Sequence, residues 1–185
     1  MANESGSQIA SKFVDPMDIL AHVSLTEGQS VADFGCGPGF FTLPMAELVG
    51  KEGHVYAIDV LEDVLNTINS QAKTRGIYNI ATSRANIEKI GGSKLKDGSV
   101  DLVVIKNVLF QNQDKATILE EASRILKNSG KIMIMEWKSD NLMFGPDAEL
   151  RIDLDDLRGM LEDKGFIVDE SFDAGDFHYV IVASK

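Results

Sequence analysis

The sequence has one cysteine, Cys36, and no apolar run that approaches the roughly 20 residues of a membrane-spanning helix. A single thiol forms neither an internal disulfide nor a metal site built from several thiolates, and it suits a reducing compartment. The first residues, MANESGSQIASK, lack the basic and then apolar pattern of a secretory signal. These absences predict a cytoplasmic protein without a membrane span.

Basic residues are also few. The chain carries 18 Lys and Arg against 29 Asp and Glu, which gives a net charge of −11. A field of that sign repels a phosphate backbone and therefore disfavours general nucleic-acid binding.

Four prolines and the lack of a low-complexity tract leave no candidate linker between two domains. Of the 185 residues, 44% are apolar. That suffices for one core, since a chain near this size removes roughly 70% of its unfolded surface from water. We predict a flexible arm over residues 1–12 and one domain over residues 13–185.

Beyond the arm, short β-like runs alternate with segments of helical period. A first helix is expected to begin at Asp15 and Pro16. The continuous apolar runs at 103–105 and 132–135 are typical of a parallel sheet covered on both faces, as in a doubly wound α/β fold. Strands are expected at 30–34, 54–58, 79–84, 100–105 and 130–137, with helices at 39–48, 61–73 and 114–127.

The C-terminal part has a different pattern. Asp153 is expected to cap a helix that ends near Lys164. Two strand-like runs follow, at 166–172 and 177–183, joined by four residues. So short a link cannot hold a parallel crossover, so the two strands must be antiparallel.

The most informative stretch is VADFGCGPGFFT, in which a strand leads through three alternate glycines, Gly35, Gly37 and Gly39, into a helix. Glycines suit a turn with positive φ or a backbone that approaches a ligand closely. The dinucleotide pattern G-x-G-x-x-G fails, because its sixth position is Phe40. Asp33 at the strand end would repel a pyrophosphate but would accept an ammonium, and the helix N-terminus suits a carboxylate.

This motif, an acidic residue followed by G-x-G-x-G, resembles the first motif of the class I S-adenosylmethionine-dependent methyltransferases. The resemblance implies a three-layer, Rossmann-like fold with a seven-stranded, mostly parallel sheet. Its order would be 3-2-1-4-5-7-6 with the last strand antiparallel. It also implies S-adenosylmethionine as cofactor and S-adenosylhomocysteine as product, and the layout is similar to the small quinone-biosynthesis-like, type 11 branch.

Later landmarks extend the predicted cofactor site. Asp59 ends the second strand, where a carboxylate accepts from both ribose hydroxyls, although NAD-binding folds share this device and a helix cap is an alternative. Asn86 stands where the family has an Asp that contacts adenine, and could instead be a turn residue. The fourth strand ends where the family's chain passes the reactive end of the cofactor. The predicted cofactor-binding residues are Asp33, Gly35, Cys36, Gly37, Gly39, Phe40, Asp59, Val60, Asn86, Ile87, Lys106 and Asn107.

Other candidates lie near the predicted acceptor. We expect Cys36 to be a packing residue, and one ring of the Phe40–Phe41 pair to be in the core while the other approaches the ligand. Glu136, Trp137 and Lys138 close the fifth strand at the ligand-binding edge, and His178 alternates on the last strand. The segment around Phe13 and the loop 139–151 would have to cover the acceptor.

The resemblance implies transfer of a methyl group by in-line displacement, and the little chain left to cover the acceptor favours a small molecule. No catalytic residue or metal cluster is recognisable in the sequence. The stretch Asn107–Phe110 lacks the Asn/Asp-Pro-Pro-aromatic run of amide methyltransferases. One thiol is too few for arsenite methylation, and Phe110–Gln111 replaces the histidines of quinone enzymes. A non-catalytic or partner-activated binder of S-adenosylmethionine and an NAD-dependent oxidoreductase remain alternatives, and the oligomeric state stays open.

Overall fold

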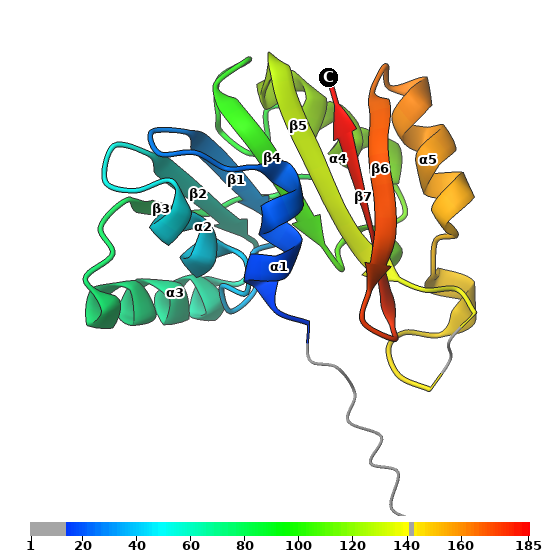
Figure 1. Ribbon diagram of the computed structural model, residues 1–185, viewed down its shortest axis with the longest axis horizontal. Coiled ribbons are helices and arrows are strands. Elements are labelled where there is room, and N and C mark those ends of the chain that lie inside the picture. Colours follow the sequence, from blue (N-terminus) through cyan, green and yellow to red (C-terminus); the bar gives the residue numbers. More distant parts are fainter. Residues whose placement is uncertain (1–13, 141–142) are drawn as a thin grey trace, which may run out of the picture.

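The computed structural model describes residues 14–140 and 143–185. The predicted arm over 1–12 and Phe13 lie outside the described residues. Seven strands form one sheet in the order β3-β2-β1-β4-β5-β7-β6 (Figure 1), as the resemblance implied. All neighbouring pairs are parallel except the two that involve β7. The strands are β1 (Ser30–Phe34), β2 (His54–Asp59), β3 (Ile80–Arg84), β4 (Val100–Lys106), β5 (Leu126–Trp137), β6 (Ile167–Ala174) and β7 (His178–Ser184).

Helices cover both faces of this sheet (Figure 1). On one face of the sheet, α1 and α2 pack against alternate residues of the central strands. On the other face, α4 and α5 pack against the sheet. Val103, Val104 and Ile105 of β4 are fully buried, which explains why the run is apolar without interruption. The helices are α1 (Pro16–Leu20), α2 (Thr42–Leu48), α3 (Glu62–Arg75), α4 (Lys115–Ile125) and α5 (Leu154–Asp163).

Short 3-10 turns complete the described chain at η1 (Ala21–Val23), η2 (Leu109–Gln111) and η3 (Ala148–Leu150). The first predicted helix thus begins as expected, with Asp15 accepting from the Met17 N–H at 2.8 Å, and its last turn is of the 3-10 type. None of the helices in the described ranges is long and apolar enough to cross a membrane.

Two predicted boundaries were wrong. The second predicted helix starts at Thr42 rather than at residue 39, because Gly37 and Gly39 have positive φ values of 49° and 94° and belong to the turn. The fourth helix ends at Ile125, and β5 begins at Leu126, which pairs with Val100. The Asn-Ser-Gly segment that follows lies in an irregularity of this pairing, because the register shifts between Leu126 and Lys131, the next residue of β5 that pairs with β4.

The strand order positions a crevice. β1 lies between β2 and β4, so the chain leaves β1 toward one side of the sheet and returns to its other side through β4. At such a switch point the loops at the carboxyl ends of the strands diverge, and ligands bind between them. The loops after β1 and β4 are those in which the sequence analysis places the cofactor.

Candidate functional site

The loop after β1 is shaped by its glycines. A Cβ on Gly35, where φ is +69°, would lie 2.3 Å from Cγ2 of Val108, so the turn and the loop after β4 approach too closely for any side chain. A Cβ on Gly37 would meet no atom within 4 Å, because this glycine faces open space. Gly39 instead allows α2 to approach Ile68 of α3. The loop therefore combines tight backbone packing with an exposed turn at Gly37.

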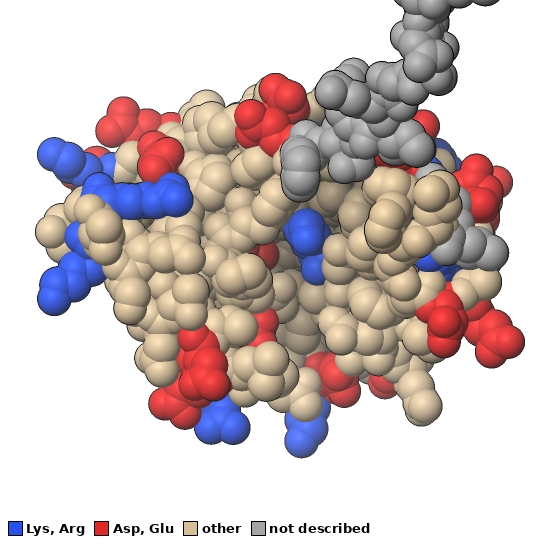
Figure 2. Space-filling model, turned by 90° about the horizontal axis from the view of Figure 1, so that it is seen from below, with Lys and Arg blue, Asp and Glu red and all other residues tan. Residues whose placement is uncertain are grey.

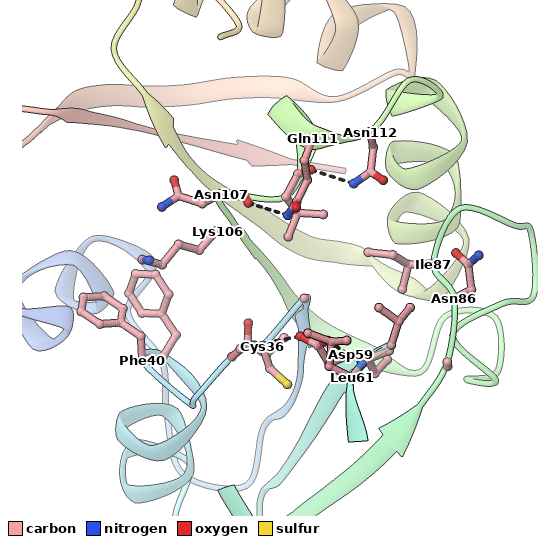
Figure 3. Close-up of a pocket in the computed structure, with 18 of the residues that line it drawn as sticks. Cys36, Phe40, Asp59, Leu61, Asn86, Ile87, Lys106, Asn107, Gln111 and Asn112 are labelled. Carbon is pink, nitrogen blue, oxygen red and sulfur yellow. Dashed lines mark hydrogen bonds between the residues drawn. The ribbon is translucent and has the colours of Figure 1, made fainter. Parts of the chain in front are cut away.

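A cleft of about 580 Å³ opens beside this loop, at the carboxyl ends of β1, β2 and β4. This volume lies within the range of roughly 300–1,000 Å³ typical of ligand sites. Of the twelve predicted cofactor residues, all but Gly39 line it. Figure 3 shows Asp59, Leu61, Asn86 and Ile87 at one end of the cleft, and Phe40, Lys106 and Asn107 at the other.

Asp59 ties the first two loops together. Its Oδ2 accepts a hydrogen bond from the Gly37 N–H at 3.0 Å, and its Oδ1 accepts from the Leu61 N–H at 3.0 Å. The second contact lies just ahead of α3, whose N-cap residue is Leu61 and has no side-chain cap, so Asp59 is not the helix cap that the sequence left open. Each carboxylate oxygen can accept a further bond. The side chain thus holds the glycine turn and still presents acceptors to the cleft.

Asp33 is a buried carboxyl at the base of the cleft, only 2% exposed. It accepts from the Thr42 hydroxyl at 2.6 Å. Burial raises its pKa to about 6, against the opposing effects of Thr42 and Lys106. The sequence reasoning did not identify Thr42, and a hydroxyl residue at the first position of the helix after the motif was the available signal.

Lys106 ends the neighbouring strand β4, two residues beyond Val104, the partner of Asp33. Its Nζ is 4.9 Å from the centroid of the Phe40 ring, close enough for a cation–π contact. Burial lowers the pKa of Lys106, and the carboxylates of Asp33 and Glu136 oppose this shift. Phe41 is 1% exposed and belongs to the core while Phe40 is half-buried, yet both residues line the cleft, so the expected division between a core ring and a ligand ring holds only in part.

Asn107 links the cleft to the last strand. It has a left-handed backbone, with φ of 54°, and its Nδ2 lies 3.2 Å from Nε2 of His178. The His178 ring packs on Trp137 with centroids 4.0 Å apart. Burial lowers the pKa of His178 to about 4, and three neighbouring cations, Lys106, Arg151 and Lys138, add to the shift. The imidazole is therefore neutral at pH 7.

Cys36 and Asn86 also line the cleft. Burial, together with Asp33 and Asp59, raises the pKa of the Cys36 thiol, so it is not a reactive thiolate. The Asn86 side-chain oxygen accepts from the Glu88 N–H at 2.8 Å, which is the turn interpretation left open above. The neighbouring Ile87 presents an apolar side chain to the cleft (Figure 3).

Two amide residues of the β4–α4 loop were not identified from the sequence. Gln111 donates to the Asn107 carbonyl at 3.0 Å, and Asn112 donates to the Val108 carbonyl at 2.7 Å. Both line the cleft. For Asn112 the sequence signal was only polarity just before a helix start, which most surface loops share, whereas Gln111 lies where the quinone enzymes have histidines.

Glu136 anchors this loop from below. Its Oε1 accepts from the Leu109 N–H at 2.8 Å, and burial raises its pKa to about 7. Among the described residues its Oε2 has no hydrogen-bond partner. Glu136 does not line the cleft. This residue, which the sequence proposed for the acceptor pocket, instead holds the backbone of the β4–α4 loop.

Figure 2 views the molecule from the side at which the parallel strands end. Charged side chains gather around the periphery of this face. Its middle is hollowed and mostly uncharged, with basic and acidic atoms visible inside the hollow. This surface favours a ligand that enters the hollow over a highly charged polymer that lies across it.

Comparisons with known proteins agree on one family. A family model described as a methyltransferase domain matches residues 25–178. The demethylmenaquinone methyltransferase of Geobacillus stearothermophilus is 30% identical over 128 residues, which cover 69% of this chain and 53% of the relative. The arsenite methyltransferase of Aquipseudomonas alcaligenes is 31% identical over 125 residues, covering 65% of this chain and 36% of the relative. The chain thus spans about half the length, or less, of these curated relatives.

Among solved structures, a SAM-dependent methyltransferase from Aquifex aeolicus superimposes with a TM-score of 0.84 at 29% identity. The match covers 92% of this chain and 89% of that one. The [4+2]-cyclase SpnF is similar in fold, with a TM-score of 0.76 at 16% identity over 92% of this chain and 81% of that one.

Proposed function

The chain belongs to the S-adenosylmethionine-dependent methyltransferases, and we propose that it transfers a methyl group to a small-molecule acceptor, with residues 13–185 as the catalytic domain. The observation that carries this proposal is the cleft at the ends of β1, β2 and β4, which is lined by Asp59, by the buried carboxyl of Asp33 and by the ammonium of Lys106. A cytoplasmic location is part of the proposal, because the single thiol suits a reducing compartment.

The residues of the cleft suit S-adenosylmethionine. Asp59 offers carboxylate acceptors to the ribose hydroxyls, and Ile87 offers an apolar surface to the adenine. Asp33 offers a carboxylate to the ammonium of the methionyl group. The open space beside Gly37 leaves room for a ligand against the backbone. No diphosphate is expected here, since the Asp33 carboxyl lines the cleft beside the glycine turn, where one would lie.

When bound, S-adenosylmethionine supplies a methyl group already activated by its sulfonium. The residues of this chain then have to bind, orient and exclude water, and alignment of this kind can lower a barrier by up to ~7–11 kcal/mol. The β4–α4 loop supports that role, because Glu136, Gln111 and Asn112 hold its backbone in place. Asn107, held by His178, positions one wall of the acceptor end.

Two features favour a small acceptor. Relatives of this chain are named for demethylmenaquinone and for arsenite, both small molecules. The net charge of −11 disfavours a nucleic acid. Arsenite itself is not favoured for this chain, because its one thiol, Cys36, is buried and protonated.

The proposal is tested by supplying the protein with S-adenosylmethionine labelled in its methyl group, together with a cell extract divided into small molecules, proteins and nucleic acids. We expect label to transfer to the small-molecule fraction at least about tenfold above a heat-inactivated control. Label in the protein or nucleic-acid fraction alone would contradict the proposed acceptor class. Binding of the donor without transfer to any fraction would instead indicate the non-catalytic subunit.

A further inference from the structure

We infer that Lys106 binds the carboxylate of the methionyl group while Asp33 binds its ammonium, so that two opposite charges select the amino-acid end of the cofactor. The inference rests on the proposed function and assigns a specificity role to one residue of that site. It requires that the two side chains face the same space, that no other group takes the carboxylate, and that Lys106 is not already paired.

The sheet places the two side chains together. Asp33 of β1 is paired with Val104 of β4, and Lys106 lies two residues further along β4, so its side chain projects from the same face of the sheet. Both line the cleft. They influence each other electrostatically, yet in the described part of the chain they form no direct ion pair. An α-amino acid head group carries its ammonium and carboxylate on one carbon, and a gap between opposite charges accommodates it.

The N-terminus of α2, the helix that follows the glycine turn, is not a second binding site for the ligand carboxylate. α2 has only seven residues, and Asp33 already lies at its start. The Thr42 hydroxyl and backbone N–H both stabilise the Asp33 carboxylate. A second carboxylate at this point would be repelled by Asp33, which favours Lys106 over the helix N-terminus as its partner.

The other cations near this end of the cleft are engaged elsewhere. Lys138 forms an ion pair with Asp173, at 2.9 Å. Arg151 donates to the backbone carbonyls of Phe144, Pro146 and Lys138. Within residues 14–140 and 143–185, the Lys106 ammonium makes no hydrogen bond or ion pair, and it lies over the Phe40 ring. Lys106 is therefore the cation available to an anionic ligand.

The test compares three ligands by calorimetry on the purified full chain: S-adenosylhomocysteine, its decarboxylated analogue, which keeps the ammonium, and 5′-methylthioadenosine, which lacks both charges. In the wild type we expect the decarboxylated analogue to bind about 10- to 100-fold more weakly than S-adenosylhomocysteine, the range that one charge-assisted hydrogen bond supports. In Lys106→Met we expect S-adenosylhomocysteine to lose this advantage, with 5′-methylthioadenosine bound as in the wild type. Lys106→Arg should retain most of the preference.

Lys89→Met is the matched control, because it removes the same charge at an exposed position outside the cleft and should leave all three affinities within about twofold. An unchanged preference for S-adenosylhomocysteine in Lys106→Met would overturn the inference and leave the proposed function intact. Equal wild-type affinities for S-adenosylhomocysteine and its decarboxylated analogue would do the same. Failure of the wild type to bind any of the three would overturn both. Unchanged binding of 5′-methylthioadenosine shows that the Lys106 variant is folded.

Discussion

Asp59→Ala is expected to lower the affinity for S-adenosylhomocysteine by about 100-fold or more. Two ribose hydroxyls lose a charged acceptor, and each such hydrogen bond contributes roughly 1.5–3 kcal/mol. The Gly37 and Leu61 N–H groups also lose their partner, so the glycine turn loosens. Isothermal titration calorimetry gives the affinity, and the melting temperature reports the structural part.

Two further variants separate binding from folding. Asp59→Asn keeps one oxygen acceptor and should lose less affinity than the alanine variant. Asp63→Ala removes a carboxylate from the exposed first turn of α3 and should bind like the wild type. An affinity of Asp59→Ala within about threefold of the wild type would remove Asp59 from the binding site.

Asp33→Asn is expected to bind S-adenosylhomocysteine at least about tenfold more weakly while unfolding at a higher temperature. The asparagine oxygen still accepts from Thr42, but the charge that attracts the ammonium is gone. Burial raises the pKa of Asp33 from 3.8 to about 6, so its proton stabilises the fold fully below pH 3.8, and this stability is lost as the pH rises through 6. At pH 7 the ionised carboxylate is therefore destabilising by roughly 2–3 kcal/mol. Its removal should raise the melting temperature by about 4–12 °C, since 1 kcal/mol shifts the melting temperature of a domain of this size by roughly 2–4 °C.

The same carboxyl predicts how binding depends on pH. Because the ammonium is attracted only to ionised Asp33, the wild-type affinity should fall by roughly tenfold between pH 7 and pH 5. Asp33→Asn should lack this fall. Glu136, whose pKa is raised to about 7, also titrates in this range but does so in both proteins. A pH profile that is identical in the two proteins would contradict the role given to Asp33.

The sequence was sufficient for the architecture because the signals were local and repeated. Continuous apolar runs predicted a sheet buried on both faces, and β4 is buried in that way. The resemblance then supplied the strand order, which no local pattern contains. The glycine turn could be placed because positive φ at Gly35 and Gly37 restricts the residue type, so the backbone geometry is visible in the sequence.

What the sequence could not supply depends on contacts between distant segments. The bond between Thr42 and Asp33 joins the start of α2 to the end of β1, and α2 begins three residues later than its pattern suggests. Glu136 is buried under a loop 27 residues earlier in the chain, and only the folded sheet brings them together. The sequence also does not show that Lys106 is the available cation, because this depends on the tertiary contacts of the neighbouring cations Lys138 and Arg151. Contacts of polar and charged side chains between distant segments could therefore not be predicted from the sequence.

The central claim is that the cleft beside β1 receives a sulfur-containing nucleoside with a zwitterionic tail, and a calorimetric titration of the purified protein tests it most directly. We predict one site per chain for S-adenosylhomocysteine, with a dissociation constant in the range of about 1–100 μM, and no detectable heat from NAD or NADH. Absence of heat from S-adenosylhomocysteine and from S-adenosylmethionine, or saturable binding of the dinucleotide in their place, would contradict the account.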